Sequence, residues 1–264
     1  MERVVVTVSD HVAHVRLNRP DKRNGLDLPM FEAIIAAGER VGAEPGVRAV
    51  VLSGEGRAFC AGLDWGAFLA LGPEGGRKLL ARDVAGSPAN LAQRACWIWR
   101  EIAVPVVAAV HGAAFGGGLQ LALAADLRIV APDAQLSLME VRYGLVPDMT
   151  ATKTLCRLVR PDVARELVYT ARIVGAAEAV AIGLATRVSE RPLEDALALA
   201  AEIAGRSPDA VRAAKRLLDQ APDLGVADAF GLETALQLTL LGTPNQAEAV
   251  QATMGQRAAS FRDP

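Results

Sequence analysis

The chain has 264 residues, of which 52% are hydrophobic and 22% charged, with a formal net charge of −2 and a pI near 6.0. A chain of this length and composition can bury a substantial core, which argues against a disordered protein. Acidic and basic residues are interspersed without a basic region, which also argues against a nucleic-acid-binding protein.

The N-terminus and the cysteines bear on the cellular compartment. Residues 1–10 lack the long apolar core and the small-residue cleavage site of a signal peptide. Cys60, Cys96 and Cys156 are far apart and have no CxxC spacing, which is typical of a reducing compartment rather than a disulfide framework. We therefore expect a cytoplasmic protein.

The first part of the chain predicts strands and helices in alternation. Residues 3–20 indicate two short strands around a turn at 9–11, because β-branched residues are frequent in them. Apolar residues at helical spacing predict a helix from Pro29, which the sequence Glu-Pro-Gly at 44–46 ends. A buried strand is predicted at 47–54.

The middle of the chain contains its longest uncharged stretch. After a Gly/Pro-rich loop at 72–76 and a helix at about 88–102, residues 102–125 carry no charge and are long enough to cross a bilayer. A proline, a histidine and several glycines interrupt this stretch. We therefore expect a buried strand at 105–110, a turn and a short buried helix, and no membrane span. Short strands follow at 127–130 and 134–139.

Beyond about residue 195 the pattern indicates helices alone. They are predicted at 194–206, 207–220, 226–241 and 243–257, with Ser207 as an N-cap. We divide the chain into a layered α/β core at 1–195, distinct from an all-parallel nucleotide fold, and a helical region at 196–264 expected to act in oligomerisation.

The glycine-rich sequence HGAAFGGGLQ at 111–120 follows the predicted buried strand. It lacks the Lys and Ser/Thr of a Walker loop, and it lacks the GxGxxG spacing with a downstream acid. A strand that runs into glycines at a helix N-terminus presents unpaired N–H groups suited to an anion. On these residues alone, a tight turn that needs glycine for packing explains the pattern equally well.

Three motifs in order, RAFCAGLD at 57–64, the glycine-rich sequence and MEVRYGLVP at 139–147, resemble the crotonase, or enoyl-CoA hydratase/isomerase, superfamily. LNRPDKRNGL at 17–26 and AIGLATRV at 181–188 extend the resemblance over most of residues 1–190. It implies an α/β fold of crotonase type, a spiral of repeated β-β-α units with a helical C-terminal region. It also implies an acyl-CoA thioester substrate, no cofactor beyond its coenzyme A moiety, and a homotrimer or dimer of trimers.

In that family, the backbone N–H groups at the positions of Leu63 and Gly117 form an oxyanion hole for the thioester carbonyl. Two fixed donors would stabilise the enolate more than the ground-state carbonyl, which is how such a site accelerates proton removal. The positions that match the family's coenzyme A path are Arg23, Arg57, Ala61 and Asp64.

The acid/base residues depart from the hydratase pattern. Hydratases of the family resemble one another in two glutamates, and here the first position is Gln120 while Glu140 occupies the second. An amide can orient a water or a substrate oxygen but cannot exchange a proton at neutral pH, which argues against hydration by a glutamate pair. Partial burial is expected to raise the pKa of Glu140 and make it the base, and a surface salt bridge with Arg142 is the alternative.

Asp148 stands eight residues after Glu140, where the family usually has glycine. In dienoyl-CoA isomerases an aspartate at the corresponding place acts in proton transfer, and halobenzoyl-CoA dehalogenases look similar there, with an aspartate nucleophile. Asp148 is therefore a candidate partner of Glu140. An N-cap of the following helix explains it equally well.

The remaining candidates favour ordinary structural roles. Three histidines without HxH or HxxxH spacing predict no metal site, so His111 is expected to be packed or hydrogen-bonded in the core. Cys60 has no histidine partner nearby in the sequence and is expected to be a packing residue. Trp65 and Tyr143 line an acyl pocket or fill the core.

The leading hypothesis is an acyl-CoA enzyme that acts through a thioester enolate with Glu140 as base. Double-bond isomerisation is favoured because one group suffices to move a proton between carbons. The alternatives are an enoyl-CoA hydratase, in which Gln120 positions water, and a non-catalytic acyl-CoA-binding protein. The acyl pocket is expected to depend on loops such as 69–87.

Overall fold

The computed structural model describes residues 2–70, 72–81 and 87–263. Residue 71 and residues 82–86, which belong to the predicted pocket loop at 69–87, lie outside the described residues.

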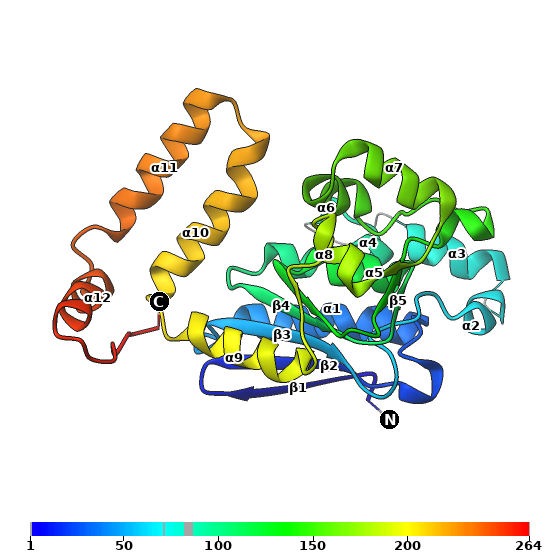
Figure 1. The fold of residues 1–264 in the computed structure, drawn as a ribbon, viewed down its shortest axis with the longest axis horizontal. Coiled ribbons are helices and arrows are strands. Elements are labelled where there is room, and N and C mark those ends of the chain that lie inside the picture. Colours follow the sequence, from blue (N-terminus) through cyan, green and yellow to red (C-terminus); the bar gives the residue numbers. More distant parts are fainter. Residues whose placement is uncertain (1, 71, 82–86, 264) are drawn as a thin grey trace.

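A six-stranded sheet forms the centre of the molecule (Figure 1). In spatial order its strands are β1 (Val4–Ser9), β2 (Val12–Leu17), β3 (Ala49–Gly54), β4 (Val106–Val110), β6 (Leu127–Val130) and β9 (Arg187–Val188). β1 and β2 pair antiparallel, as predicted, whereas the other neighbouring pairs are parallel. Asp10 and His11 join the hairpin with positive φ angles, the conformation of a tight hairpin turn.

A second, three-stranded sheet lies beside the first. It consists of β5 (Ala113–Phe115), β7 (Gln135–Ser137) and β8 (Val174–Gly175), in that spatial order. The helices of this part of the chain are α1 (Leu28–Ala43), α2 (Trp65–Ala70), α3 (Gly72–Leu80), α4 (Leu91–Glu101), α5 (Gly117–Ala124), α6 (Ala151–Leu158), α7 (Pro161–Thr170) and α8 (Ala176–Ala181), with the short 3-10 helices η1 (Pro20–Lys22) and η2 (Glu140–Tyr143).

The core lies on both faces of the large sheet. The larger cluster of buried side chains joins one face to α1, α4 and α5, and every residue of α5 is buried. The other face is covered by α9 (Pro192–Ala204), whose Ala196, Ala200 and Ala204 recur at helical spacing. Small side chains at these positions let the helix approach the strands closely.

The predicted loop at 72–76 is wrong, because these residues begin the helix α3. Glycine and proline lower helix propensity, but tertiary packing overrides that preference. Leu79, near the end of α3, is buried, and α3 contacts α4. The predicted strands at 105–110 and 127–130 and the helices predicted at 194–206, 207–220, 226–241 and 243–257 are confirmed within a few residues.

The last helices extend away from the core as a hairpin (Figure 1). They are α10 (Pro208–Gln220) and α11 (Val226–Leu240), joined by the 3-10 helix η3 (Ala221–Asp223) and followed by α12 (Pro244–Met254). Lys215 anchors α10, since its Nζ lies 2.7 Å from Asp126 Oδ2 and donates to the Trp99 carbonyl over 3.3 Å. No described helix is long and apolar enough to span a membrane.

Two bends of the chain meet at the N-terminus of α5. Cys60 N donates to the Ala113 carbonyl over 3.0 Å, and Phe115 N donates to the Cys60 carbonyl over 3.0 Å. Gly118 lies so close to this segment that an added Cβ would be 2.2 Å from the Cys60 carbonyl oxygen. Only a residue without a side chain fits there, and the fit holds the two bends together.

We expect Gly118→Ala to destabilise the protein by about 1–3 kcal/mol or more, because the added methyl group would press on a buried backbone that cannot move away. Urea unfolding measures this change. The matched control is Gly46→Ala, since a Cβ at Gly46 would meet no atom within 4 Å, and it should change stability by less than about 0.5 kcal/mol. Equal stability of the two variants would contradict the close approach.

Candidate active site

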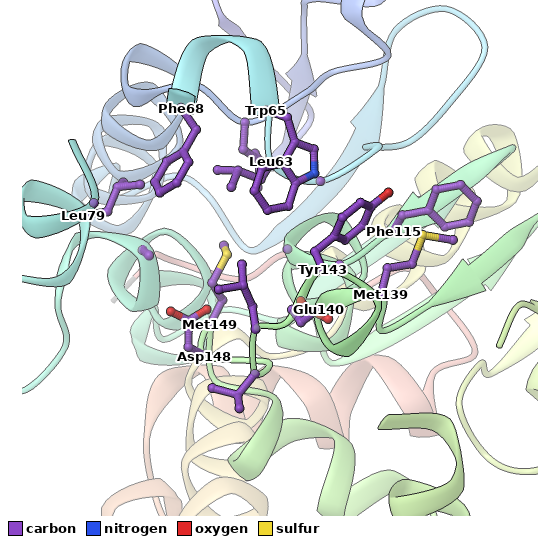
Figure 2. Close-up of a pocket in the computed structure, with 18 of the residues that line it drawn as sticks. Leu63, Trp65, Phe68, Leu79, Phe115, Met139, Glu140, Tyr143, Asp148 and Met149 are labelled. Carbon is purple, nitrogen blue, oxygen red and sulfur yellow. The ribbon is translucent and has the colours of Figure 1, made fainter. Parts of the chain in front are cut away.

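A cavity of about 380 Å³ lies between α2, α3 and η2. Most of its walls are apolar, and aromatic side chains form one side, with Trp65 and Phe68 across from the carboxylates of Glu140 and Asp148 (Figure 2). Among the described lining residues, these two carboxylates are the only charged groups. The cavity therefore combines an apolar space with two groups that can exchange protons.

The two glycine-bearing bends form one wall of this cavity. A Cβ at Gly62 would lie 2.5 Å from the Phe115 carbonyl oxygen and 3.6 Å from Gly117 N, so the bends are in direct contact. Leu63 and Gly117 both line the cavity. Within the described part of the chain, neither of their amides donates a hydrogen bond to a protein acceptor. Two backbone donors therefore remain available next to the cavity.

Glu140 begins η2, three residues after β7, and lies over the second bend. A Cβ at Gly116 would be 3.4 Å from Glu140 Oε1, and Gly116 N donates to the Ser137 carbonyl over 2.8 Å. Burial raises the pKa of this carboxyl, and the nearby Asp148 adds to the rise, while hydrogen bonds to the carboxylate oppose it. The alternative of a salt bridge with Arg142 is wrong, because Glu140 forms no ion pair among the described residues.

Gln120 lies behind Glu140 and is completely buried. Its Nε2 donates to Glu140 Oε1 over 2.6 Å, and its Oε1 accepts from Met149 N at 2.8 Å and Ala151 N at 3.1 Å. Gln120 is not among the described residues that line the cavity. The structure thus uses this amide to hold protein groups, whereas we expected it to orient a water or a substrate oxygen.

The interpretation of Asp148 as a helix N-cap is wrong. α6 begins at Ala151 after Thr150, and the first-turn amide of Ala151 donates to Gln120 instead of to Asp148. Gln120 therefore takes the capping role and leaves the Asp148 carboxylate at the cavity. Burial raises the pKa of Asp148, although its side chain is still exposed, so that solvent screens the effect.

The residues expected along the coenzyme A path do not all meet the cavity. Ala61 lines it, and Ala61 N donates to the Arg23 carbonyl over 2.9 Å. Arg23 and Arg57 are exposed and are not among the described lining residues. Asp64 forms an ion pair with Arg19, and its carboxylate also accepts from Ala67 N at the start of α2. That hydrogen bond and Arg19 lower the pKa of Asp64.

Other candidates have structural surroundings. Cys60 is fully buried, its thiol donates to the Asn24 carbonyl, and burial raises its pKa to about 12, which confirms a packing role. His111 Nε2 donates to the Gly56 carbonyl over 3.0 Å, although the ring is partly exposed rather than in the core. Trp65 and Tyr143 line the cavity, with ring centroids 4.9 Å apart. No group of three metal-ligating side chains gathers among the described residues.

The sequence missed several apolar lining residues. Phe68, Leu79 and Leu80 lie on α2 and α3, and Leu79 and Leu80 follow the predicted loop at 72–76. Met149 closes the cavity beside Asp148. The glycines of this segment obscured its helical pattern in the sequence.

Comparison with known proteins connects this geometry to a family. Residues 7–264 match the family model for enoyl-CoA hydratase/isomerase. The chain is 33% identical to a human mitochondrial Delta(3,5)-Delta(2,4)-dienoyl-CoA isomerase, over 94% of this chain and 78% of the relative. It is 37% identical to a Mycobacterium tuberculosis protein named "Probable enoyl-CoA hydratase EchA14", over 94% and 93% of the two chains.

A solved structure agrees with the fold. An enoyl-CoA hydratase from Bacillus anthracis superposes with a TM-score of 0.91 and 30% identity, over 98% of each chain. This agreement confirms the α/β fold of crotonase type that the motifs implied.

The raised pKa of Glu140 has a consequence for stability. Burial raises this pKa above its value in the unfolded chain, so ionisation of Glu140 lowers the free energy of unfolding. The full loss of stability is present at pH values above the raised pKa, and no loss remains at pH values well below about 4.3, the ordinary pKa of a glutamate. Glu140→Gln removes the charge, so we expect it to melt above the wild type at pH 8, by about 2–4 °C for each kcal/mol relieved. The difference should shrink towards pH 4.5.

Thermal unfolding at the two pH values measures this effect in the absence of substrate. Asp162→Asn is the control of opposite sign, because a hydrogen bond from Arg160 lowers the pKa of Asp162 to about 2. That variant should not melt above the wild type at pH 8. A Glu140→Gln protein that melts at or below the wild type at pH 8 would show that the carboxylate is not destabilised by burial.

Proposed function

The chain belongs to the enoyl-CoA hydratase/isomerase family, and from that premise we propose that it moves a carbon–carbon double bond within an enoyl-CoA or dienoyl-CoA ester. One observation supports this reaction above all. Glu140 and Asp148 are the charged groups of one apolar cavity in the described structure, while an amide, Gln120, occupies the position of the first of the two hydratase glutamates.

The thioester carbonyl is bound by the amides of Leu63 and Gly117. Glu140 takes a proton from the acyl chain: the C–H bond breaks, an O–H bond forms on the carboxylate, and the electron pair moves through the conjugated chain onto the thioester oxygen. The two amides stabilise the resulting enolate, and removal of one such donor typically costs about 10²–10³-fold in rate. The electron pair then moves back from the thioester oxygen to a different carbon, which takes the proton from Glu140 or from a protonated Asp148; in the second case the two carboxyls exchange protons with solvent before the next turnover.

The raised pKa values of both carboxyl groups suit this role. A carboxyl whose pKa lies closer to neutrality is a stronger base and can also deliver a proton within the same cycle. The cavity brings no lysine, arginine or histidine near them among its described lining residues, so no neighbouring positive charge lowers their basicity.

Water addition is the second candidate, because the comparisons include enoyl-CoA hydratases. In that reaction Glu140 alone would activate the water and deliver the proton. Isomerisation fits the site better, since Gln120 uses its amide on Glu140 and on the backbone of Met149 and Ala151. A protein that binds acyl-CoA without turnover is the third outcome that the experiment below distinguishes.

The coenzyme A moiety is assigned to the face beside Ala61. The exposed guanidinium groups of Arg23 and Arg57 would pair with its phosphates, while Asp64 positions the start of α2 through Ala67 N. Proton transfer needs no cofactor beyond the coenzyme A moiety of the substrate. We place the enzyme in the cytoplasm, a reducing compartment that keeps its three cysteines as the free thiols seen here.

We also propose that the chain assembles into a homotrimer or a dimer of trimers. α11 supports this, because it is rich in apolar residues and has no buried residue in the described single chain. Phe230 is 61% exposed and Leu238 is 66% exposed. A helix that exposes so many apolar side chains is normally covered, and a second copy of the chain would cover it.

Turnover of a panel of enoyl-CoA and dienoyl-CoA esters tests the function. We expect wild-type products of unchanged mass with a shifted double bond, whereas hydration would add the mass of one water. Glu140→Gln should lower the rate by about 10²–10⁴-fold, and Asp148→Asn should slow the return of the proton. Asp133→Asn, at an exposed turn, should retain wild-type activity.

Hydrated product that still forms in Glu140→Gln would contradict the role of Glu140. Ester binding without any change of product, in the wild type as in Glu140→Gln, would favour the binding protein.

The assembly is tested by light scattering after size-exclusion chromatography. We expect a wild-type mass of three or six times the 27.7 kDa chain. The double variant Phe230→Glu/Leu238→Glu should dissociate, because burying two carboxylates at an interface is costly. Gln237→Glu adds a charge at an exposed polar position of the same helix and should remain assembled. A monomeric wild type would refute the assembly.

A further inference from the structure

We propose that Gln120 is a positioning residue that joins Glu140 to the loop carrying Asp148 and, by occupying Oε1 of Glu140, makes Oε2 the oxygen that exchanges the substrate proton. This inference rests on the proposed function and concerns the same site. It assigns a task to a residue that neither accepts nor releases a proton.

One end of the Gln120 side chain donates a hydrogen bond and the other end accepts hydrogen bonds. Its Nε2 donates to Glu140 Oε1 over 2.6 Å, and its Oε1 accepts from two backbone amides, Met149 N and Ala151 N. Only a side chain with a donor and an acceptor can make both connections at neutral pH. Since Gln120 is fully buried, no water competes for these bonds.

The two oxygens of Glu140 are therefore not equivalent. Oε1 is held by Gln120, whereas Oε2 is buried and has no hydrogen-bond partner among the described residues. An unpartnered carboxylate oxygen in an apolar cavity is costly and correspondingly basic. The amide thus orients the carboxylate and leaves Oε2 without a competing hydrogen bond among the described residues.

The same amide restrains the loop next to Asp148. Met149 and Ala151 flank Thr150, which has φ +79, a left-handed conformation that is unusual for a β-branched residue. Strained backbone persists only where surrounding contacts hold it, and the two hydrogen bonds to Gln120 provide such contacts. Loss of the amide would release Glu140 and the Asp148 loop together.

A glutamate at position 120 would change the charge state of the site. Its carboxyl would lie at hydrogen-bond distance from Glu140, and two such groups must share a proton and titrate as a coupled pair. Among the described residues, Asp148 and Tyr143 share the cavity with Glu140, and the buried thiol of Cys96 on α4 interacts with it electrostatically. Gln120 keeps the pair from forming, so Glu140 titrates without a second carboxyl beside Oε1.

Three variants test this role: Gln120→Met, which keeps the length but loses both hydrogen-bonding ends, Gln120→Glu, and the matched control Gln93→Glu. Gln93 lies outside the cavity, in the capping box of α4, where glutamate is also favoured. One readout is a ¹³C NMR titration of the Glu140 carboxyl without substrate. The other is the pH profile of kcat and of kcat/KM for double-bond migration.

For Gln120→Met we expect the pKa of Glu140 to rise, because this variant lacks the hydrogen bond from Gln120 that stabilises the ionised carboxylate. The acid limb of the pH–rate profile should shift to higher pH, and kcat should fall at least tenfold with little change in KM. For Gln120→Glu we expect the Glu140 carboxyl to titrate in two steps, with a new loss of rate at high pH where the shared proton leaves. Gln93→Glu should match the wild type in both readouts.

A purely structural role would lower the stability of the variants without moving the titration of Glu140 in the folded protein. An unchanged titration in Gln120→Met and a single step in Gln120→Glu would overturn the inference, as would equal shifts in Gln93→Glu. If Gln120→Met does not fold, Gln120→Glu alone decides. The NMR readout needs no turnover, so a wild type without double-bond migration would refute the proposed function and leave this test standing.

Discussion

The contact between the two glycine-bearing bends is the constraint on which the site depends. Gly118 has no room for a side chain against the Cys60 carbonyl, and Gly62 has none against the Phe115 carbonyl. Because backbone packs directly on backbone, the amides of Leu63 and Gly117 are held beside one cavity. Backbone donors fixed in this way need no reorganisation when charge develops nearby, which is why rigid bends suit anion stabilisation.

Burial then sets the chemistry of the opposite wall. Glu140 and Asp148 enter an apolar cavity without a basic partner among its described lining residues, so both keep raised pKa values. Carboxylates without a basic partner in an apolar cavity cost stability. The cost is limited by Gln120, which satisfies one oxygen of Glu140 and two backbone amides at the start of α6 with a single neutral side chain.

The C-terminal helices differ in how they are anchored to the core. α9 packs its alanines on the central sheet, and Lys215 ties α10 to Asp126 at the start of β6. α11 has neither kind of anchor and exposes Phe230 and Leu238. The two clusters of buried core residues therefore have no member beyond Ala204, and α11 leaves apolar side chains exposed in the single chain.

The sequence by itself determined the α/β class, the hairpin at the N-terminus and the helical tail, and it predicted Glu140 and Asp148 as partners, because periodicity, turn residues and ordered motifs are local signals. Tertiary structure alone decided what those residues contact. The glycines of α3 concealed a helix that packing stabilises. The sequence Pro-Asp-Met-Thr indicated Asp148 as an N-cap of α6, whereas in the structure the first-turn amide of α6 donates to Gln120, 28 residues before Asp148. Hydrogen bonds between residues distant in sequence leave no periodic trace in the chain, so only the folded arrangement reveals them.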